Sequence, residues 1–126
     1  MCSYCGQEQE TLQHLFIDCP HISSLWTALQ AWLNSILNLR NPVRLTTADI
    51  LFGSQQPNFE LINLIILLAK KYIYQNKFSS RNVTIDSFKA LLKYRFSIEK
   101  CIARKNNKLE EFFTKWVHLY YYHFNE

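Results

Sequence analysis

The sequence predicts an all-α fold, a small helical bundle, on three observations. Its 126 residues are the size of one ordinary domain, and 48% of them are hydrophobic, which is enough for a packed core. Only 2 glycines and 3 prolines are present, too few for the many tight turns of a β-sandwich or barrel. Apolar residues also recur at spacings of three and four along several long segments, as they do on one face of a helix.

The first long helix and a short one are expected between residues 20 and 53. Pro20 is suited to a helix start, and the segment HISSLWTALQAWLNSIL after it has an amphipathic spacing of apolar residues. Pro42 is expected to end this regularity. Thr47 is expected to cap a short helical turn, ADILF, which Gly53 terminates.

Three more long helices are expected in the rest of the chain. Asn58 is the expected N-cap of FELINLIILLAKKYIYQNKF, whose first half is apolar almost all round and is therefore expected to be the central buried helix. Thr84, with Asp86 in the first turn, is expected to open IDSFKALLKYRFSIEKCIARK. The polar run 105–108 is expected to separate it from a last helix, KLEEFFTKWVHLYYYHF.

Three of the four cysteines lie in the first nineteen residues, together with a histidine. The spacing is Cys2-x2-Cys5-x8-His14-x4-Cys19, and Gly6 helps the tight turn to point the first two sulfurs at one ion. A His and a Cys from a following helical turn complete a tetrahedron, which is the arrangement that Zn²⁺ favours. Four protein ligands leave no open position, so we expect one structural zinc ion, Zn²⁺, rather than a catalytic one.

The segment around these ligands is too small to bury much apolar surface, so metal binding is expected to supply much of its folding free energy. Thr11 is expected to cap the turn that presents His14. Four side chains are expected to dock that turn on the body: Leu12, Leu15, Phe16 and Ile17. We divide the chain into a CCHC zinc-binding segment, 1–26, and a helical body, 27–126, which form one compact unit.

Two alternatives remain for this cluster. His21 lies just past Cys19 and competes with His14 as the histidine ligand, although the intervening Pro20 stiffens the backbone. The other interpretation is a set of ordinary reduced cysteines beside a surface histidine, because a CxxC alone is a weak pattern.

The first 26 residues resemble a known family. The stretch CSYCGQEQETLQHLFIDCPHISSLW is similar to the zinc-binding segment that follows the reverse transcriptase domain in polyproteins of LINE-type, non-LTR retrotransposons. That family is typified by two cysteines two apart, an E-T-x-x-H-L-F-x-x-C-P run and a later tryptophan. The matching residues are Glu10, Thr11, His14, Leu15, Phe16, Cys19, Pro20 and Trp26. Fainter resemblance continues through ADILFG, IILLAKKYIYQNKF and KCIARKNNKLEEFFTKW.

The resemblance implies a zinc-stabilised, nucleic-acid-binding C-terminal domain that helps a polymerase to hold template RNA or target DNA. By this resemblance, the zinc ligands are Cys2, Cys5, His14 and Cys19. The implied partners are RNA or DNA and a reverse transcriptase domain. Family members place this domain behind a polymerase and usually an endonuclease, neither of which fits within 126 residues. The chain is therefore expected to be a fragment of a decayed element, an isolated domain or a captured piece with another use.

Basic residues on two predicted helices form an independent case for nucleic acid, since cations meet phosphates and aromatic rings stack on bases. One group falls within about 60° on a helical wheel: Lys89, Lys93, Lys100 and Arg104. The opposite side is apolar and is expected to face the core: Leu91, Tyr94, Ile98 and Ile102. A second group contains a tyrosine: Lys70, Lys71, Tyr74, Lys77 and Arg81. The alternative is that these lysines only supply the polar faces that surface helices need.

The remaining motifs favour packing over chemistry. Trp116, Leu119, Tyr120 and His123 share one helical face, which is expected to pack against the core or a partner. Cys101 is expected to be a buried apolar filler. A phosphate-binding glycine loop, a G-x-S-x-G elbow and an H-E-x-x-H motif are absent from the sequence, so we expect no enzyme and no small-molecule substrate.

Three functions are compatible with the sequence. The favoured one is a zinc-stabilised nucleic-acid-binding module of a retroelement. The second is a helical protein-interaction module whose aromatic C-terminus, residues 116–124, docks a partner such as the polymerase, and the third is an enzyme of unrecognised type. The longest apolar stretch, LINLIILLA, is too short for a membrane span and a signal peptide is not visible, so we expect an intracellular protein in the nucleus or cytoplasm that does not bind a membrane.

Overall fold

The computed structural model of the protein describes residues 1–37, 42–55, 59–79 and 83–122. Over these ranges the chain is all-α and without strands, as predicted. Its elements are the one-turn π-helix η1 (His14–Asp18) and the α-helices α1 (Pro20–Leu37), α2 (Thr47–Phe52), α3 (Phe59–Asn76), α4 (Ile85–Lys105) and α5 (Leu109–Tyr122).

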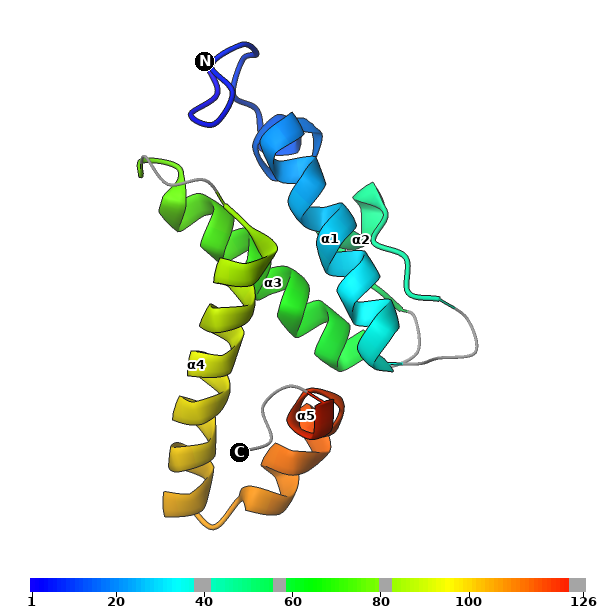
Figure 1. Ribbon diagram of the computed structural model, residues 1–126, viewed down its shortest axis with the longest axis vertical. Helices are drawn as coiled ribbons and strands as arrows, with labels where there is room; N and C mark the ends of the chain where they lie inside the picture. The colour runs from blue at the N-terminus through cyan, green and yellow to red at the C-terminus, as the bar shows by residue number, and fades with distance from the viewer. Residues whose placement is uncertain (38–41, 56–58, 80–82, 123–126) are drawn as a thin grey trace.

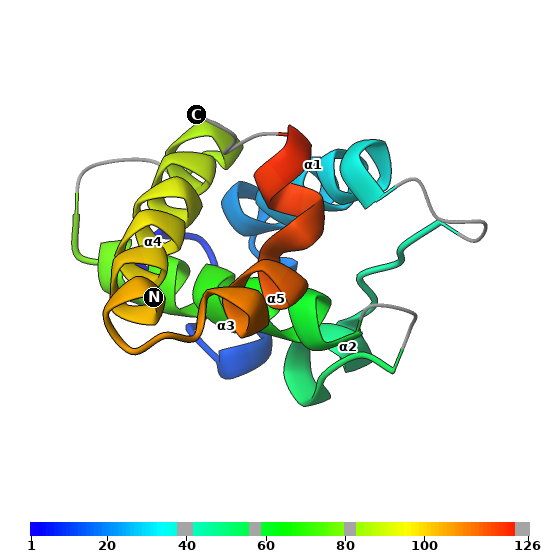
Figure 2. The same ribbon diagram turned by 90° about the horizontal axis from the view of Figure 1, so that it is seen from below.

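The helices form a bundle with the cysteine segment at one end and α5 at the other (Figure 1). Helix α1 contacts η1, α4 and α5, and α5 also contacts α3 and α4. Figure 2 views the α5 end and shows this helix lying among α1, α3 and α4. Because α1 begins at Pro20 and runs past residue 26, the cysteine segment and the helical body share a helix.

The core is built mainly from α1 and α3. Helix α1 buries eight side chains at the spacing that its amphipathic pattern predicted: Ile22, Leu25, Trp26, Leu29, Trp32, Leu33, Ile36 and Leu37. Helix α3 buries residues on one face, an arc of about 160° at 100° per residue, including Ile62, Ile65 and Ile73, which have no accessible surface. The expected central helix thus contributes one face to the core, but it is not buried all round, since Leu67 in its apolar first half is 61% exposed.

The helix boundaries follow the predicted caps with one correction. The N-cap of α2 is Thr46, and the prediction of Thr47 was wrong by one residue. The Thr46 backbone is extended, its hydroxyl accepts the Asp49 N–H at 3.2 Å, and the Asp49 carboxylate accepts the Thr46 N–H in return. Gly53 ends α2 at a φ of 97°, which favours glycine, and Thr84 caps α4 as predicted. The predicted cap Asn58 lies outside the described residues.

Helix α4 has three faces instead of the predicted two. Its buried residues are Phe88, Leu92 and Phe96. The residues expected to face the core are exposed, by 36% at Leu91, 67% at Tyr94, 39% at Ile98 and 54% at Ile102. That prediction was wrong because the core face lies between the other two, about 90° from the basic stripe and about 115° from the apolar one at 100° per residue.

The end of the bundle formed by α4 and α5 is held by aromatic rings and one carboxylate. The Phe96 ring packs 4.9 Å from Phe112 and edge-on, 5.7 Å from Trp116, which is fully buried. The Trp116 indole N–H donates to the Glu99 carboxylate at 2.6 Å, so this buried donor is satisfied. Packing of Trp116 was predicted correctly, whereas Cys101, expected to be buried, is exposed.

Candidate metal centre

The four predicted ligands come together at the N-terminal end of the bundle. The ligand atoms of Cys2, Cys5, His14 and Cys19 all lie within 4.8 Å of one another. The Cys2 and Cys19 sulfurs are 3.9 Å apart, and the Cys5 sulfur is 3.3 Å from His14 Nε2. A zinc tetrahedron with Zn–S of about 2.3 Å and Zn–N of about 2.05 Å has edges of about 3.8 Å and about 3.6 Å. The cluster therefore has the dimensions of a metal site.

Local hydrogen bonds explain why these residues meet. The Cys2 N–H donates to the Glu8 carbonyl at 2.7 Å and the Gly6 N–H to the Cys2 carbonyl at 2.9 Å, and these two bonds close the first turn. Gly6 has a φ of 66° in this turn, which an L side chain would strain. As predicted, Thr11 caps the turn that presents His14, whose N–H donates to the Thr11 hydroxyl at 3.0 Å.

The fourth ligand is fixed by the start of α1. The Cys19 carbonyl accepts the N–H groups of Ile22 and Ser23, each at 2.8 Å. Burial raises the pKa of the Cys19 thiol, and the nearby backbone N–H of His21 opposes this rise. Cys19 thus directly precedes the N-terminus of α1, which is a favourable place for the negative charge of a thiolate.

The thiols of the cluster differ in acidity without a cation. Backbone N–H groups of Gln7 and Glu8, with a smaller contribution from His14, lower the pKa of Cys5 to about 6. Burial, together with the neighbouring Cys2, raises the pKa of Cys19 to about 11. A divalent cation is needed to hold both as thiolates, so metal binding must release a proton from Cys19 near neutral pH.

The competing histidine is not part of the cluster. His21 is an exposed residue in the first turn of α1, and among the described residues the group that can hold an ion contains His14 instead. The geometry thus favours the predicted ligand set, Cys2, Cys5, His14 and Cys19.

Two polar contacts fasten the cysteine segment to the C-terminal end of α3. The Tyr4 hydroxyl donates to the Ile73 carbonyl, and burial raises the pKa of Tyr4 to about 12. The Lys77 ammonium lies 2.6 Å from the Glu10 carboxylate, which also accepts the Ser3 N–H and hydroxyl. Sequence reasoning missed both contacts, because they join residues 69 and 67 positions apart.

Apolar side chains of η1 complete the docking, with one exception. Leu15 is buried, and Phe16 and Ile17 pack against the core as predicted. The Trp26 indole N–H donates to the Phe16 carbonyl, which fixes η1 on α1. Leu12 was also expected to dock but is 73% exposed, because it lies before the turn, on the side that faces solvent.

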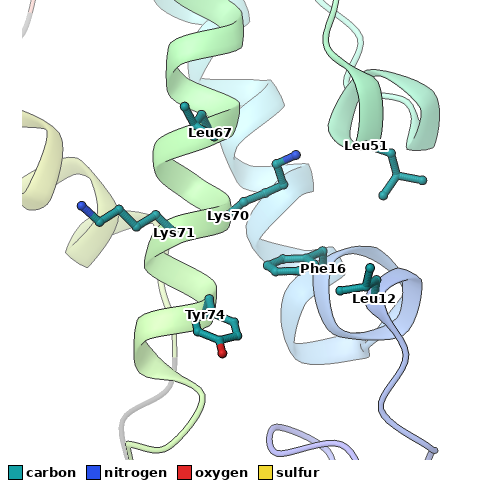
Figure 3. Close-up of a pocket in the computed structure, with 7 residues that line it drawn as sticks. All are labelled: Leu12, Phe16, Leu51, Leu67, Lys70, Lys71 and Tyr74. Carbon is teal, nitrogen blue, oxygen red and sulfur yellow. The ribbon is translucent and has the colours of Figure 1, made fainter.

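A shallow groove of about 390 Å³ runs between this segment and α3 (Figure 3). Its walls are apolar apart from two lysines and a tyrosine: Leu12, Phe16, Leu51, Leu67, Lys70, Lys71 and Tyr74. Figure 3 shows Lys70 reaching over the space between α3 and Phe16, whereas Lys71 points to the other side of α3. Neither lysine forms an ion pair with another described residue. Three residues predicted to contact nucleic acid, Lys70, Lys71 and Tyr74, therefore line a groove whose opposite wall includes Leu12 and Phe16 of the cysteine segment.

The other predicted nucleic-acid contacts are placed differently. Lys77 is tied to Glu10, with 11% of its side chain exposed, and its ammonium also lies 5.3 Å from the centre of the Tyr74 ring. Lys89 lies over the Trp32 ring and Lys100 over the Phe113 ring, at 5.2 Å and 5.8 Å, so both are half-buried. Lys93 and Arg104 are exposed on α4, and Arg81 lies outside the described residues.

Comparison of the chain with models of protein families, with curated proteins and with solved structures finds no match. Among the described helices, none combines the length and the apolar character needed to cross a membrane.

Proposed function

We propose that this protein is a zinc-stabilised nucleic-acid-binding module without catalytic activity of its own, related to the C-terminal segment of LINE-type retrotransposon polyproteins. Zinc is the ion best suited to three thiolates and one imidazole at tetrahedral spacing. Cys2, Cys5, His14 and Cys19 hold it, and its role is to stabilise the fold of residues 1–19. RNA or DNA is the expected ligand.

The observation that carries this proposal is the groove beside the metal cluster. Lys70 offers a cation without an ion-pair partner among the described residues, and Tyr74 is 55% exposed one helical turn away. A phosphate on Lys70 and a base on the Tyr74 ring form a combination that tolerates any sequence. Without zinc the wall formed by η1 loses its support, so the metal is expected to matter for binding as well as for folding.

The first test concerns the metal. Purified wild-type protein is expected to contain one zinc ion per chain, which His14→Ala loses and the matched variant His21→Ala retains. Zinc that is lost with His21→Ala and kept with His14→Ala would contradict the ligand set. The absence of zinc from reduced wild-type protein would remove the basis of the proposal.

The second test concerns the groove. Fluorescence anisotropy with single-stranded and duplex RNA and DNA is expected to show binding that weakens steeply with salt. Lys70→Glu should weaken binding. It should also reduce the slope of log affinity against log salt concentration by roughly one, the value for one lost phosphate contact. Lys108→Glu makes the same change of charge at the far end of the bundle, between α4 and α5, and should have a much smaller effect. Equal losses in both variants would assign the binding to net charge alone.

The alternative of a protein-docking module at residues 116–124 has less support. It requires an exposed apolar patch there, but Trp116, the one residue of 116–124 whose side chain lies within the described part of the structure, is fully buried. Among the described helices, it is α4 that carries a continuous row of exposed apolar residues.

A further inference from the structure

Helix α4 carries an apolar stripe that no other described element covers. The α4 stripe consists of Leu91, Tyr94, Ile98 and Ile102. Figures 1 and 2 both show α4 at the edge of the bundle, with one side away from the other helices. A groove of about 530 Å³ between α4 and α5 continues the stripe through Ile98, Ile102 and Phe112. Apolar side chains in a continuous row are characteristic of an interaction surface.

The spacing of the stripe is that of a helix pair. Leu91, Tyr94, Ile98, Cys101 and Lys105 follow at intervals of three and four, as the a and d positions of a heptad do. The buried residues of α4 occupy other heptad positions, so the same helix can pack on its own core and on a second helix at once. The stripe is about 17 Å long between Leu91 and Ile102, which is about three turns.

We propose that α4 pairs with α4 of a second copy of this chain, in antiparallel orientation, and that the protein forms a weak dimer through this stripe. A second copy supplies an apolar row of equal length and spacing. Pairing of identical surfaces around a twofold axis is also the commonest way in which proteins form dimers. The short seam explains why the dimer is weak.

Charge selects the antiparallel orientation. In a parallel pair the exposed Lys105 of each copy faces the other on the seam, and Arg104 lies beside it. Like charges in direct contact are unfavourable. In an antiparallel pair centred between Tyr94 and Ile98, each Lys105 lies near Ser87 and the acidic first turn of the partner helix, which contains Asp86. The helix dipoles are then also opposed.

Side-chain size agrees with the same alignment. Leu91 of one copy lies opposite Cys101 of the other, so that a large residue faces a small one. Tyr94 lies opposite Ile98 at the centre. Lys89 and Lys100 do not obstruct the seam, because they are held over the rings of Trp32 and Phe113 on another side of the helix.

Sedimentation equilibrium of the zinc-loaded chain from 1 to about 500 µM tests the proposal. We expect a monomer–dimer equilibrium whose dissociation constant increases at least tenfold in Ile98→Glu, with an unchanged melting temperature because Ile98 is outside the core. Ser97→Glu introduces the same charge one residue away from the stripe and should leave the dimer intact. A wild-type monomer at every concentration, or a dimer that Ile98→Glu does not weaken, would overturn the proposal.

Cross-linking distinguishes the orientations. Mild oxidation of Leu91→Cys should give a covalent dimer through the introduced thiol and Cys101 of the second copy, and Leu91→Cys with Cys101→Ser should not. Wild-type chains should cross-link poorly, since the two Cys101 residues of an antiparallel pair lie about 15 Å apart. Rapid cross-linking of wild-type chains through Cys101 would reject the antiparallel arrangement.

Discussion

The ion pair between Glu10 and Lys77 allows a quantitative test of how the metal segment is attached to the bundle. The two charged groups are 2.6 Å apart, and their side chains are 25% and 11% exposed. Exposed pairs contribute about 0–1 kcal/mol, and breaking a fully buried pair costs about 3–5 kcal/mol. The coupling between these two residues is therefore expected to be about 1–2 kcal/mol.

A double-mutant cycle measures this coupling. Urea unfolding at pH 7 of zinc-loaded wild type, Glu10→Gln, Lys77→Met and the double variant gives the four free energies of unfolding. Lys77→Met retains the packing of the side-chain stem and removes the charge. Each single variant should melt about 3–8 °C lower than wild type. A coupling below about 0.3 kcal/mol would show that the contact does not fasten the segment.

The same pair has a defined pH dependence. Hydrogen bonding from Lys77, followed by bonds from Ser3, lowers the pKa of Glu10 from 4.5 to about 2. Its stabilisation is therefore complete above pH 4.5 and is lost as the pH falls towards 2. The difference between wild type and Glu10→Gln should shrink over this interval, and a difference that stays constant would refute the assignment.

Three further predictions concern Cys19, Glu99 and the cap of α2. Zinc affinity should rise at least tenfold per pH unit from pH 6 to 8, because the raised pKa of Cys19 requires a proton to leave; competition with a chromophoric chelator measures it. Glu99→Leu should lower the free energy of unfolding by about 1–3 kcal/mol because it leaves the buried Trp116 N–H without its acceptor, and Glu110→Gln, on the exposed side of α5, should change it by less than about 0.5 kcal/mol in the same urea titration. Thr46→Ala should lower the free energy of unfolding by about 1 kcal/mol because it removes the cap of α2, whereas Thr47→Ala should not. A larger loss in Thr47→Ala would show that Thr47 is the cap, as the sequence predicted.

Local patterns in the sequence predicted local structure well. The spacing of Cys2, Cys5, His14 and Cys19 predicted a cluster because a tight turn and a single helical turn leave little freedom in where these side chains lie. Thr84 predicted the start of α4 for a similar reason, since a cap bonds to a backbone group three residues away.

Long-range packing could not be predicted in the same way. The helical wheel of α4 contains two apolar arcs, and periodicity alone does not say which one meets the rest of the chain. The core selected the arc of Phe88, Leu92 and Phe96, in which Phe88 packs against Tyr72 of α3 and Phe96 packs against rings of α5. The same limitation applies to Lys77, whose ion pair with Glu10 could not be predicted because the two residues are 67 positions apart.

The Tyr4 hydroxyl connects the C-terminal end of α3 to the metal cluster, although α3 supplies none of the candidate ligands. The N–H of Lys77 bonds to the Tyr74 carbonyl, so the Ile73 carbonyl is left for Tyr4 to satisfy. Chelation of the metal should release Tyr4 and leave the last turn of α3 to fray. Amide hydrogen exchange near residues 74–77 should then accelerate, while exchange in the middle of α3 stays slow. Amide hydrogen exchange at the end of α3 would therefore measure whether the cluster holds a metal ion, without any label on the cysteines.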